Sequence, residues 1–292
     1  MGCDVGVAAP TSLSLPGSLG RSGLLKRLAS ALVLLPVFMV IVVNAPGWMF
    51  NLLVVIASAV ALWELVRMFE QAGRPVYKGL AVVAGTTLTA AFAASRLLDP
   101  LLLPSVVLTL AVGVVLAAPI GQGRPPSTEP VANTLTAVLY VGWLLGYGIL
   151  LHHTSPLGDQ LVLFLVGVTW VGETVAYLVG STLGRHKLAA VISPRKTVEG
   201  AVAQVAASVL TAAGLGAWLL PACGAGVTLL AGALLGVVGQ VGDLAESVIK
   251  RSVGAKDTGG LIPGHGGVLD RIDSLLFNLP AFYYFAQWTR CA

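Results

Sequence analysis

The amino-acid sequence predicts an all-α, polytopic integral membrane protein with about nine transmembrane helices and a cytoplasm-facing polar site near the last helices. Of its 292 residues, 56% are hydrophobic and 10% are charged, and the mean hydropathy is +0.88. The apolar residues form continuous runs of about 16 to 25, long enough to cross a hydrocarbon core of about 30 Å as helices. A β-barrel would show short alternating segments instead, and a soluble core is excluded.

Nine apolar segments between turn signals and charges predict the spans. They cover residues 28–43, 49–68, 78–95, 101–120, 134–151, 160–183, 198–220, 227–249 and 270–288. Residues 1–24 are rich in Ser, Gly and Pro without hydrophobic periodicity, which predicts a flexible tail. N-terminal transmembrane helices are expected over 25–155. No small-residue cleavage site follows the first apolar run, so a retained helix is favoured over a signal peptide.

The basic residues predict the orientation. With a cytoplasmic N-terminus, 15 of the 17 Lys and Arg residues fall on the cytoplasmic side, and only Arg96 and Arg290 fall outside. This distribution follows the positive-inside rule. The formal net charge of +4 is therefore explained largely by topology beside anionic lipid, and no nucleic-acid partner is expected.

A polar stripe ends the eighth predicted span. Its residues share one helical face because they follow at i, i+3, i+4 and i+7: Asp243, Glu246, Ser247 and Lys250. A rise of about 1.5 Å per residue places this stripe at the cytoplasmic edge of the membrane. Earlier in the same span, Gly232 and Gly236 form a small-xxx-small pair that lets another helix approach closely.

A glycine-rich loop, residues 254–268, follows this stripe and contains His265. Glycines permit positive φ and close approach of backbone amides, which is what wrapping a phosphate chain requires. The ninth span then opens with Asp270 and Asp273 on one face, so two helix ends bring carboxylates to one loop. Such oxygen ligands suit Mg²⁺, which also binds nucleotide phosphates. The alternative is that these acids only pair with basic residues in a solvated turn.

A second charged cluster, GRHKLAAVISPRKTVEG, joins the sixth and seventh predicted spans. Thr197 as an N-cap and Glu199 in the first turn are explained by ordinary helix initiation. Capping does not explain four basic residues within twelve: Arg185, Lys187, Arg195 and Lys196. Upstream, Glu173 lies about 18 Å along the sixth span from Leu161. An acid at that depth costs about 2.5 to 3.5 kcal/mol, so it is a candidate functional residue.

Other features receive simpler interpretations. Glu64 in the second span is expected to pair with Arg67 at i+3. His152 and His153 are interpreted as surface residues of an outer loop. The three cysteines support neither a disulfide framework nor a zinc site because their spacing is irregular: Cys3, Cys223 and Cys291.

Residues 247–273 resemble the signature S-x-x-K-R-x4-K-D-x-G-x3-P-x-H-G-G-x2-D-R-x-D of phosphatidate cytidylyltransferases, the CDP-diacylglycerol synthases. Thirteen fixed positions match within 27 residues. The segments SPRKTVEG and GDLAES are similar to two further motifs of that family, so the resemblance covers about residues 170 to 290. One departure concerns the sixth span, where Glu173 stands in place of the usual Asp.

The resemblance implies that the lipid phosphate of phosphatidate attacks the α-phosphorus of CTP and releases pyrophosphate. It places this catalytic transmembrane region, residues 156–292, at the inner face of a bacterial cytoplasmic membrane. It implies Mg²⁺ with potassium as a second cation, and, together with the small-residue stripes, a homodimer. The implied metal ligands are Asp243, Asp270 and Asp273. These three aspartates and Lys256 are also the implied catalytic residues. The implied substrate-binding residues are Glu173, Ser193, Lys196, Thr197, Glu199, Lys250, Arg251, Asp257, His265, Gly266, Gly267 and Arg271.

Two other functions are compatible with parts of this pattern. A CTP-dependent polyprenol or lipid kinase would transfer the γ-phosphoryl group and release CDP instead of pyrophosphate. A secondary transporter would also use membrane acids, but its site should lie near the midplane within inverted repeats. Here the polar residues crowd one side. The D-x2-D-G-x2-A-R run that a CDP-alcohol phosphotransferase needs is absent from the sequence.

Overall fold

The computed structural model describes residues 36–96, 99–121, 127–259 and 266–291, and it is built mainly of helices. Residues 36–44 are helical. The N-terminal half continues with α2 (Gly47–Gln71), α3 (Lys78–Ala91), α4 (Leu102–Ala117), α5 (Glu129–Ala137), the π-helical turn η3 (Val138–Trp143) and α6 (Leu144–His153). The C-terminal half contains α7 (Gly158–Thr182), α8 (Val198–Leu219), α9 (Ala225–Ser252) and α10 (Leu269–Thr289). Short 3₁₀ turns cover Phe92–Arg96, Ala118–Gly121 and Pro221–Cys223.

Six helical stretches in the described part of the chain are long and apolar enough to cross a membrane: Gly47–Gln71, Leu102–Ile120, Glu129–His153, Gly158–Thr182, Val198–Leu219 and Ala225–Ser252. The apolar helix Lys78–Ala94 is shorter. Helix α10 has 21 residues but carries acids in its first turns and Pro280 in its interior. The first predicted span lies partly outside the described residues. The chain is therefore a polytopic membrane protein, with fewer long apolar helices described than the nine predicted.

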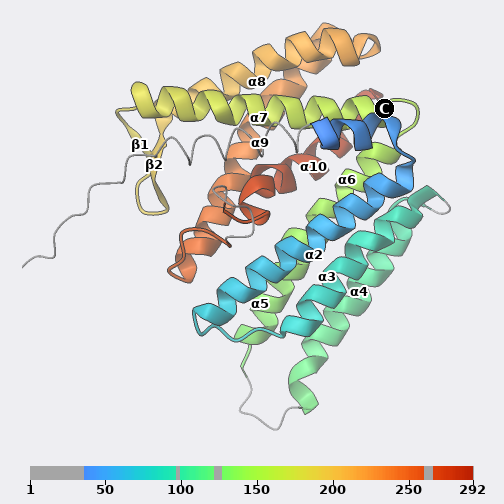
Figure 1. The fold of residues 1–292 in the computed structure, drawn as a ribbon, viewed down its shortest axis with the longest axis vertical. Coiled ribbons are helices and arrows are strands. Elements are labelled where there is room, and N and C mark those ends of the chain that lie inside the picture. The colour runs from blue at the N-terminus through green and yellow to red at the C-terminus, as the bar shows by residue number, and fades with distance from the viewer. Residues whose placement is uncertain (1–35, 97–98, 122–126, 260–265, 292) are drawn as a thin grey trace, which may run out of the picture.

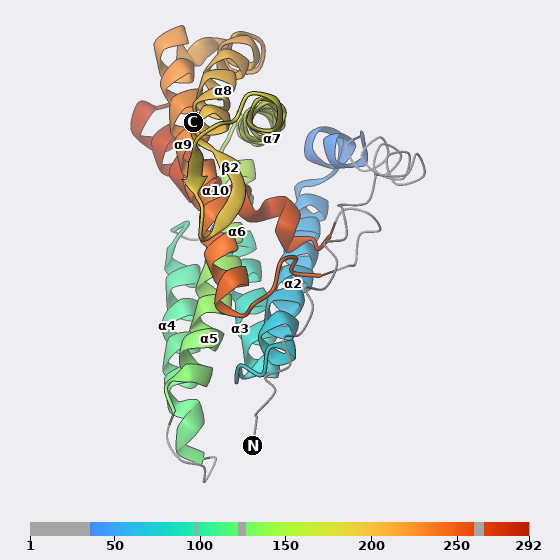
Figure 2. The same ribbon diagram turned by 90° about the vertical axis from the view of Figure 1, so that its left-hand side faces the viewer.

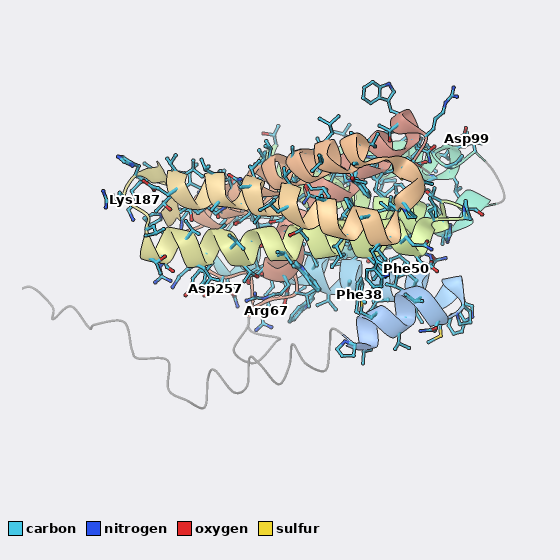
Figure 3. The ribbon with its side chains drawn as sticks, turned by 90° about the horizontal axis from the view of Figure 1, so that it is seen from above. Phe38, Phe50, Arg67, Asp99, Lys187 and Asp257 are labelled. Atoms are coloured by element: carbon cyan, nitrogen blue, oxygen red, sulfur yellow. A yellow bond between two sulfur atoms is a disulfide. The ribbon has the colours of Figure 1, made fainter. Side chains whose placement is uncertain are left out.

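The helices form two groups that cross each other. In Figure 1, α2, α3, α4 and α5 run roughly along one direction, while α7 and α8 lie across the upper part of the molecule. Figure 2 shows α7 nearly end-on above the α2–α5 group, with α10 between the two groups. Helices α7, α8, α9 and α10 also pack on one another in sequence order. Figure 3 shows Lys187, Asp257 and Arg67 toward one end of the molecule and Phe50 and Asp99 toward the other.

One element departs from the all-α prediction. Strands β1 (Lys187–Ala189) and β2 (Ser193–Thr197) form a two-stranded antiparallel sheet, with Lys187 opposite Thr197 and Ala189 opposite Ser193. This segment is too polar for the hydrocarbon region, where an open sheet would leave backbone groups unpaired. Outside that region, water is available to satisfy the edges of such a sheet. The hairpin therefore lies at the end of α7, as Figure 1 shows.

Glycines let the C-terminal helices approach at backbone distance. A Cβ at Gly236 would lie 3.0 Å from Val205 Cα of α8, and Gly232 meets the same helix, which confirms the predicted close contact. A Cβ at Gly242 would lie 2.9 Å from the backbone oxygen of Asp273 in α10. The glycine face of α9 thus fixes α8 on one side and α10 on the other, which sets the spacing of the polar residues at its end.

Two interpretations of the end opposite the charged loops are corrected. Cys223 and Cys291 form a disulfide that joins the turn between α8 and α9 to the end of α10. Their separation of 68 residues gave no signal in the sequence. His152 is buried, stacks on Phe50 with ring centroids 4.1 Å apart, and lies 3.2 Å from a carboxylate oxygen of Asp159. Since α6 extends to His153, His152 lies in a helix of the packed interior and not in a surface loop.

Candidate active site

The end of α9 and the start of α10 are joined through Lys250. Its Nζ donates to Glu246 Oε2 at 2.6 Å and to Asp270 Oδ1 at 2.9 Å. The side chain of Glu246 is 1% exposed, that of Asp270 is 11% exposed and that of Lys250 is 13% exposed. The predicted polar stripe is therefore confirmed as one face, and its lysine neutralises two largely buried carboxylates instead of extending freely into solution.

Asp270 also organises the glycine-rich loop. Its carboxylate accepts hydrogen bonds from the backbone amides of Thr258, at 3.1 Å, and of Gly267, at 2.9 Å. Gly266 adopts a φ of +80°, which favours glycine and lets the chain turn back onto Asp270. The Gly267 amide, predicted to bind substrate phosphate, is thus already bonded to a carboxylate. Asp270 would have to exchange these partners to serve as a metal ligand.

Four acids gather beside this pair, and we call them the acid cluster: Glu173, Asp243, Glu246 and Asp273. Asp273 of α10 lies close enough to Glu246 and Asp243 of α9 to interact with both. Glu173 of α7 interacts with Asp273 and Asp243 as well. Lys196, on strand β2, contacts Asp243 Oδ2 through its Nζ at 2.6 Å. The two charged segments of the sequence therefore meet at one place in the fold.

The acid cluster contains more carboxylates than nearby cations. Glu246 Oε1 is buried and has no hydrogen-bond partner within the described part of the chain. A bound cation would satisfy this oxygen together with Asp273 and Asp243, so these residues fit a metal such as Mg²⁺ by donor type. In the present arrangement, however, no group of three His, Cys, Asp or Glu side chains among the described residues is arranged to hold a metal. The acid cluster therefore matches a metal in donor chemistry and in charge, and not in its present geometry.

Glu64 is a site residue that the sequence interpretation missed. It is 1% exposed in α2, and its carboxylate accepts hydrogen bonds from the backbone amides of Val268 and Leu269 at the start of α10. The expected pair with Arg67 does not form, because the Arg67 guanidinium lies over the Trp63 ring, 4.9 Å from its centroid. The insertion cost that singled out Glu173 applies equally to Glu64, but the expected local pair with Arg67 was taken to compensate it.

Tyr140 is another residue that the sequence interpretation missed, and unlike Glu64 it carried no sequence signal. It lies in the π-helical turn η3, is 7% exposed, and its hydroxyl has no hydrogen-bond partner among the described residues. Its neighbours include Glu246 and Asp273. Because π-helical turns occur frequently at functional sites, this hydroxyl is a candidate donor toward the acid cluster or toward a ligand there.

Several predicted substrate-binding residues have local structural partners. Thr197 caps α8 by accepting a hydrogen bond from the Gly200 amide at 3.2 Å. Glu199 accepts hydrogen bonds from the backbone amides of Arg185 and His186. Arg251 donates to the carbonyl oxygens of Ile192 and Ala255, and so ties the β1–β2 hairpin to the end of α9. These contacts build the loops around the acid cluster.

The remaining predicted residues lie around this site. Ser193 begins strand β2 and is partly buried. Three charged residues are exposed at the same end of the molecule as the acid cluster: Lys256, Asp257 and Arg271. His265 lies outside the described residues. The structure thus brings the acids and Lys196 together, and places the exposed charges at the periphery.

The fold and site define an integral membrane protein with a carboxylate and lysine site at one end of its helices. Comparison with known proteins identifies its family: the profile of the Cytidylyltransferase family matches residues 25–289, and the chain belongs to this family.

Curated relatives match about half of the chain. It is 46% identical over 131 residues to a phosphatidate cytidylyltransferase of Synechocystis sp., covering 44% of each chain. It is 40% identical over 157 residues to one from Staphylococcus saprophyticus, covering 51% of this chain and 56% of the relative. It is also 42% identical over 156 residues to the uncharacterized protein YnbB of Escherichia coli, covering 53% of this chain and 51% of YnbB. The chain thus spans about half the length of the curated relatives it matches.

Proposed function

We propose that this protein is a phosphatidate cytidylyltransferase, which converts CTP and phosphatidate to CDP-diacylglycerol and pyrophosphate. Membership of the Cytidylyltransferase family and the names of two matched relatives support this assignment. The observation that carries it is the meeting of the acid cluster, Lys196 and Lys250 at one end of an apolar bundle. A lipid headgroup and a water-soluble nucleotide can meet only at such an interface.

The proposed reaction needs no protein nucleophile. A phosphate oxygen of phosphatidate attacks the α-phosphorus of CTP, the bond from that phosphorus to the bridging oxygen breaks, and pyrophosphate leaves. Catalysis then consists mainly of positioning and charge neutralisation. Lys196 and the exposed Lys256 and Arg271 are suited to bind phosphate oxygens, whereas Lys250 holds Glu246 and Asp270 in place.

A Mg²⁺ ion would be held by Asp243 and Asp273, with Glu246 as a further ligand. When bound, the metal would neutralise charge on the phosphate oxygens of CTP. The chain's own residues prepare this arrangement: Lys196 orients Asp243, and Lys250 keeps Glu246 in position. Asp270 and a second cation such as potassium remain part of the proposal, on the condition that Asp270 releases its present partners.

We also propose that the acid cluster faces the cytoplasm of a bacterial inner membrane, in a chain with up to nine crossings. The distribution of basic residues supports this orientation. The Cys223–Cys291 disulfide at the opposite end supports it independently, because disulfides persist in oxidising compartments. The proposal of a homodimer therefore rests on the family resemblance alone, since Gly232 and Gly236 pack against α8 within one chain.

Product analysis with purified protein tests the proposal. The protein is incubated with labelled CTP and phosphatidate, with and without Mg²⁺, and CDP-diacylglycerol and pyrophosphate are expected only with the divalent cation. Asp273→Asn should lose most turnover while remaining folded, whereas Asp99→Asn at the opposite end serves as the matched control. Release of CDP with a phosphorylated lipid would identify a kinase instead. Undiminished turnover of Asp273→Asn would remove this residue from the site.

A further inference from the structure

Glu64 is an acid within the apolar helix α2, far from the signature motif in the sequence. It lies in α2 and is 1% exposed, so its charge is removed from solvent at considerable cost. A buried carboxylate is retained only where donors compensate it. The donors that Glu64 uses belong to the glycine-rich loop and the start of α10.

The carboxylate of Glu64 caps α10 from outside. Its Oε1 accepts from the Val268 amide at 3.1 Å and its Oε2 accepts from the Leu269 amide at 2.9 Å. These are among the first amides of α10, which have no partner within the helix. The N-cap residue, Val268, has no side-chain cap of its own. A carboxylate more than 200 residues away in the chain therefore supplies the cap, and the partial positive charge of the helix end favours it.

Two glycines of the signature are explained by this carboxylate. A Cβ at Gly259 would lie 3.0 Å from Glu64 Oε1, and a Cβ at Gly267 would lie 2.6 Å from Oε2. Any side chain at 267 would press against this carboxylate and against the Thr258 hydroxyl oxygen, which would lie 2.5 Å from the added Cβ. Within the described part of the loop, these glycines therefore serve the approach of Glu64 as well as backbone flexibility.

The loop is held from its other side by the site itself. Asp270 accepts from the amides of Thr258 and Gly267, and Lys250 connects Asp270 to Glu246 of the acid cluster. Glu64 and Asp270 thus bind neighbouring amides at positions 267 to 269. A continuous set of contacts leads from α2, through the first turn of α10, to the acid cluster.

We propose that Glu64 is a positioning residue, which anchors the glycine-rich loop and the first turn of α10 to α2 and so fixes Asp270 and Asp273 for catalysis. The inference rests on the proposed function for its effect on turnover, while the anchoring itself can be measured without any substrate. Nothing in the motif resemblance assigns a role to this residue, because it lies in a helix that matches only as a generic apolar span.

Glu64→Gln is the informative variant. The amide keeps one acceptor oxygen but turns an NH₂ group toward the second backbone N–H, so one amide of α10 loses its partner. Glu64→Asp keeps both acceptor oxygens on a shorter side chain and tests rescue by the conserved charge. Glu70→Gln is the matched control, because Glu70 lies on the same helix, is exposed and bonds only to Lys78 among the described residues.

Hydrogen exchange of the full-length protein in detergent, followed by mass spectrometry, measures the anchor. Peptides covering 266–272 should exchange about tenfold faster or more in Glu64→Gln, since a hydrogen bond to a charged group is worth at least that factor. Peptides from α7 and α8 should be unchanged, Glu64→Asp should lie between Glu64→Gln and the wild type, and Glu70→Gln should match the wild type. In the activity assay, kcat of Glu64→Gln should fall about tenfold while KM for CTP changes less than about threefold.

Two outcomes overturn the proposal: unchanged exchange of the 266–272 peptides, or equally faster exchange throughout the protein with loss of kcat. If Glu64→Gln does not fold, Gly267→Ala replaces it, because its added Cβ would lie 2.6 Å from Glu64 Oε2, as well as 2.5 Å from Thr258 Oγ1, and should release the same peptides. An unaffected loop in Gly267→Ala would likewise overturn the anchor. Failure of the wild type to form CDP-diacylglycerol would overturn the proposed function alone, and the exchange comparison would still decide the anchor.

Discussion

Removing the ammonium group of Lys250 should destabilise the protein strongly. Its Nζ lies 2.6 Å from Glu246 Oε2 and 2.9 Å from Asp270 Oδ1, and the Glu246 side chain is 1% exposed. Lys250→Met keeps the apolar stem and removes only the charge. Asp270 retains the amides of Thr258 and Gly267, but Glu246 loses its only donor among the described residues. Leaving a buried charge without its partner costs about 3 to 5 kcal/mol, so the free energy of unfolding should fall by that amount.

Lys78→Met provides the control, because Lys78 pairs with Glu70 at 2.9 Å where the two side chains are 46% and 41% exposed. Loss of such a surface pair costs at most about 1 kcal/mol. Unfolding of detergent-solubilised protein by denaturant, followed by tryptophan fluorescence, measures both variants. The double variant Lys250→Met with Glu246→Met should recover most of the loss, because no uncompensated buried charge then remains at 246. Equal destabilisation by Lys250→Met and Lys78→Met would refute the reasoning.

Three further predictions follow from individual contacts. Thr197→Ala removes the cap of α8 and should lower the free energy of unfolding by about 1 kcal/mol. Thr197→Ser keeps the hydroxyl and should retain most of the stability. Equal thermal stability of the two variants would contradict the capping role. Gly242→Leu should separate α9 from α10 and reduce CDP-diacylglycerol formation, while Gly214→Ala, where a Cβ meets nothing within 4 Å, should leave turnover unchanged. Intact-mass measurement without reductant should find the protein two hydrogen atoms lighter than the reduced form. Cys223→Ser should lower the free energy of unfolding by about 4 kcal/mol on a loop-entropy estimate for the 68-residue separation; a free thiol at Cys223 in the native protein would contradict the disulfide.

The helical class could be predicted from the sequence because the membrane leaves few alternatives. Backbone groups in hydrocarbon must pair within one segment, so a long apolar run indicates a helix with little ambiguity. Local spacing gave the polar face of α9 for the same reason, since residues at i and i+4 of a helix meet whatever surrounds them. The capping role of Thr197 was equally local.

Local patterns did not determine the number of long apolar helices. Helix α10 carries carboxylates and Pro280, and the apolar helix Lys78–Ala94 is short, so neither reaches the length and hydropathy that the other helices have. The β1–β2 hairpin was missed because its two strands are only three and five residues long, and short polar strands resemble loops in a sequence.

By itself, the sequence determined the membrane class, the family resemblance of the two charged segments, and the shared helical face of Asp243, Glu246 and Lys250. Only the tertiary structure decided that Glu64 bonds α10, that Cys223 meets Cys291, and that Asp270 binds backbone amides of the loop. The physical reason is the range of the interactions. A helix or a cap depends on residues within about four positions of each other, whereas these contacts join segments brought together only by helix packing.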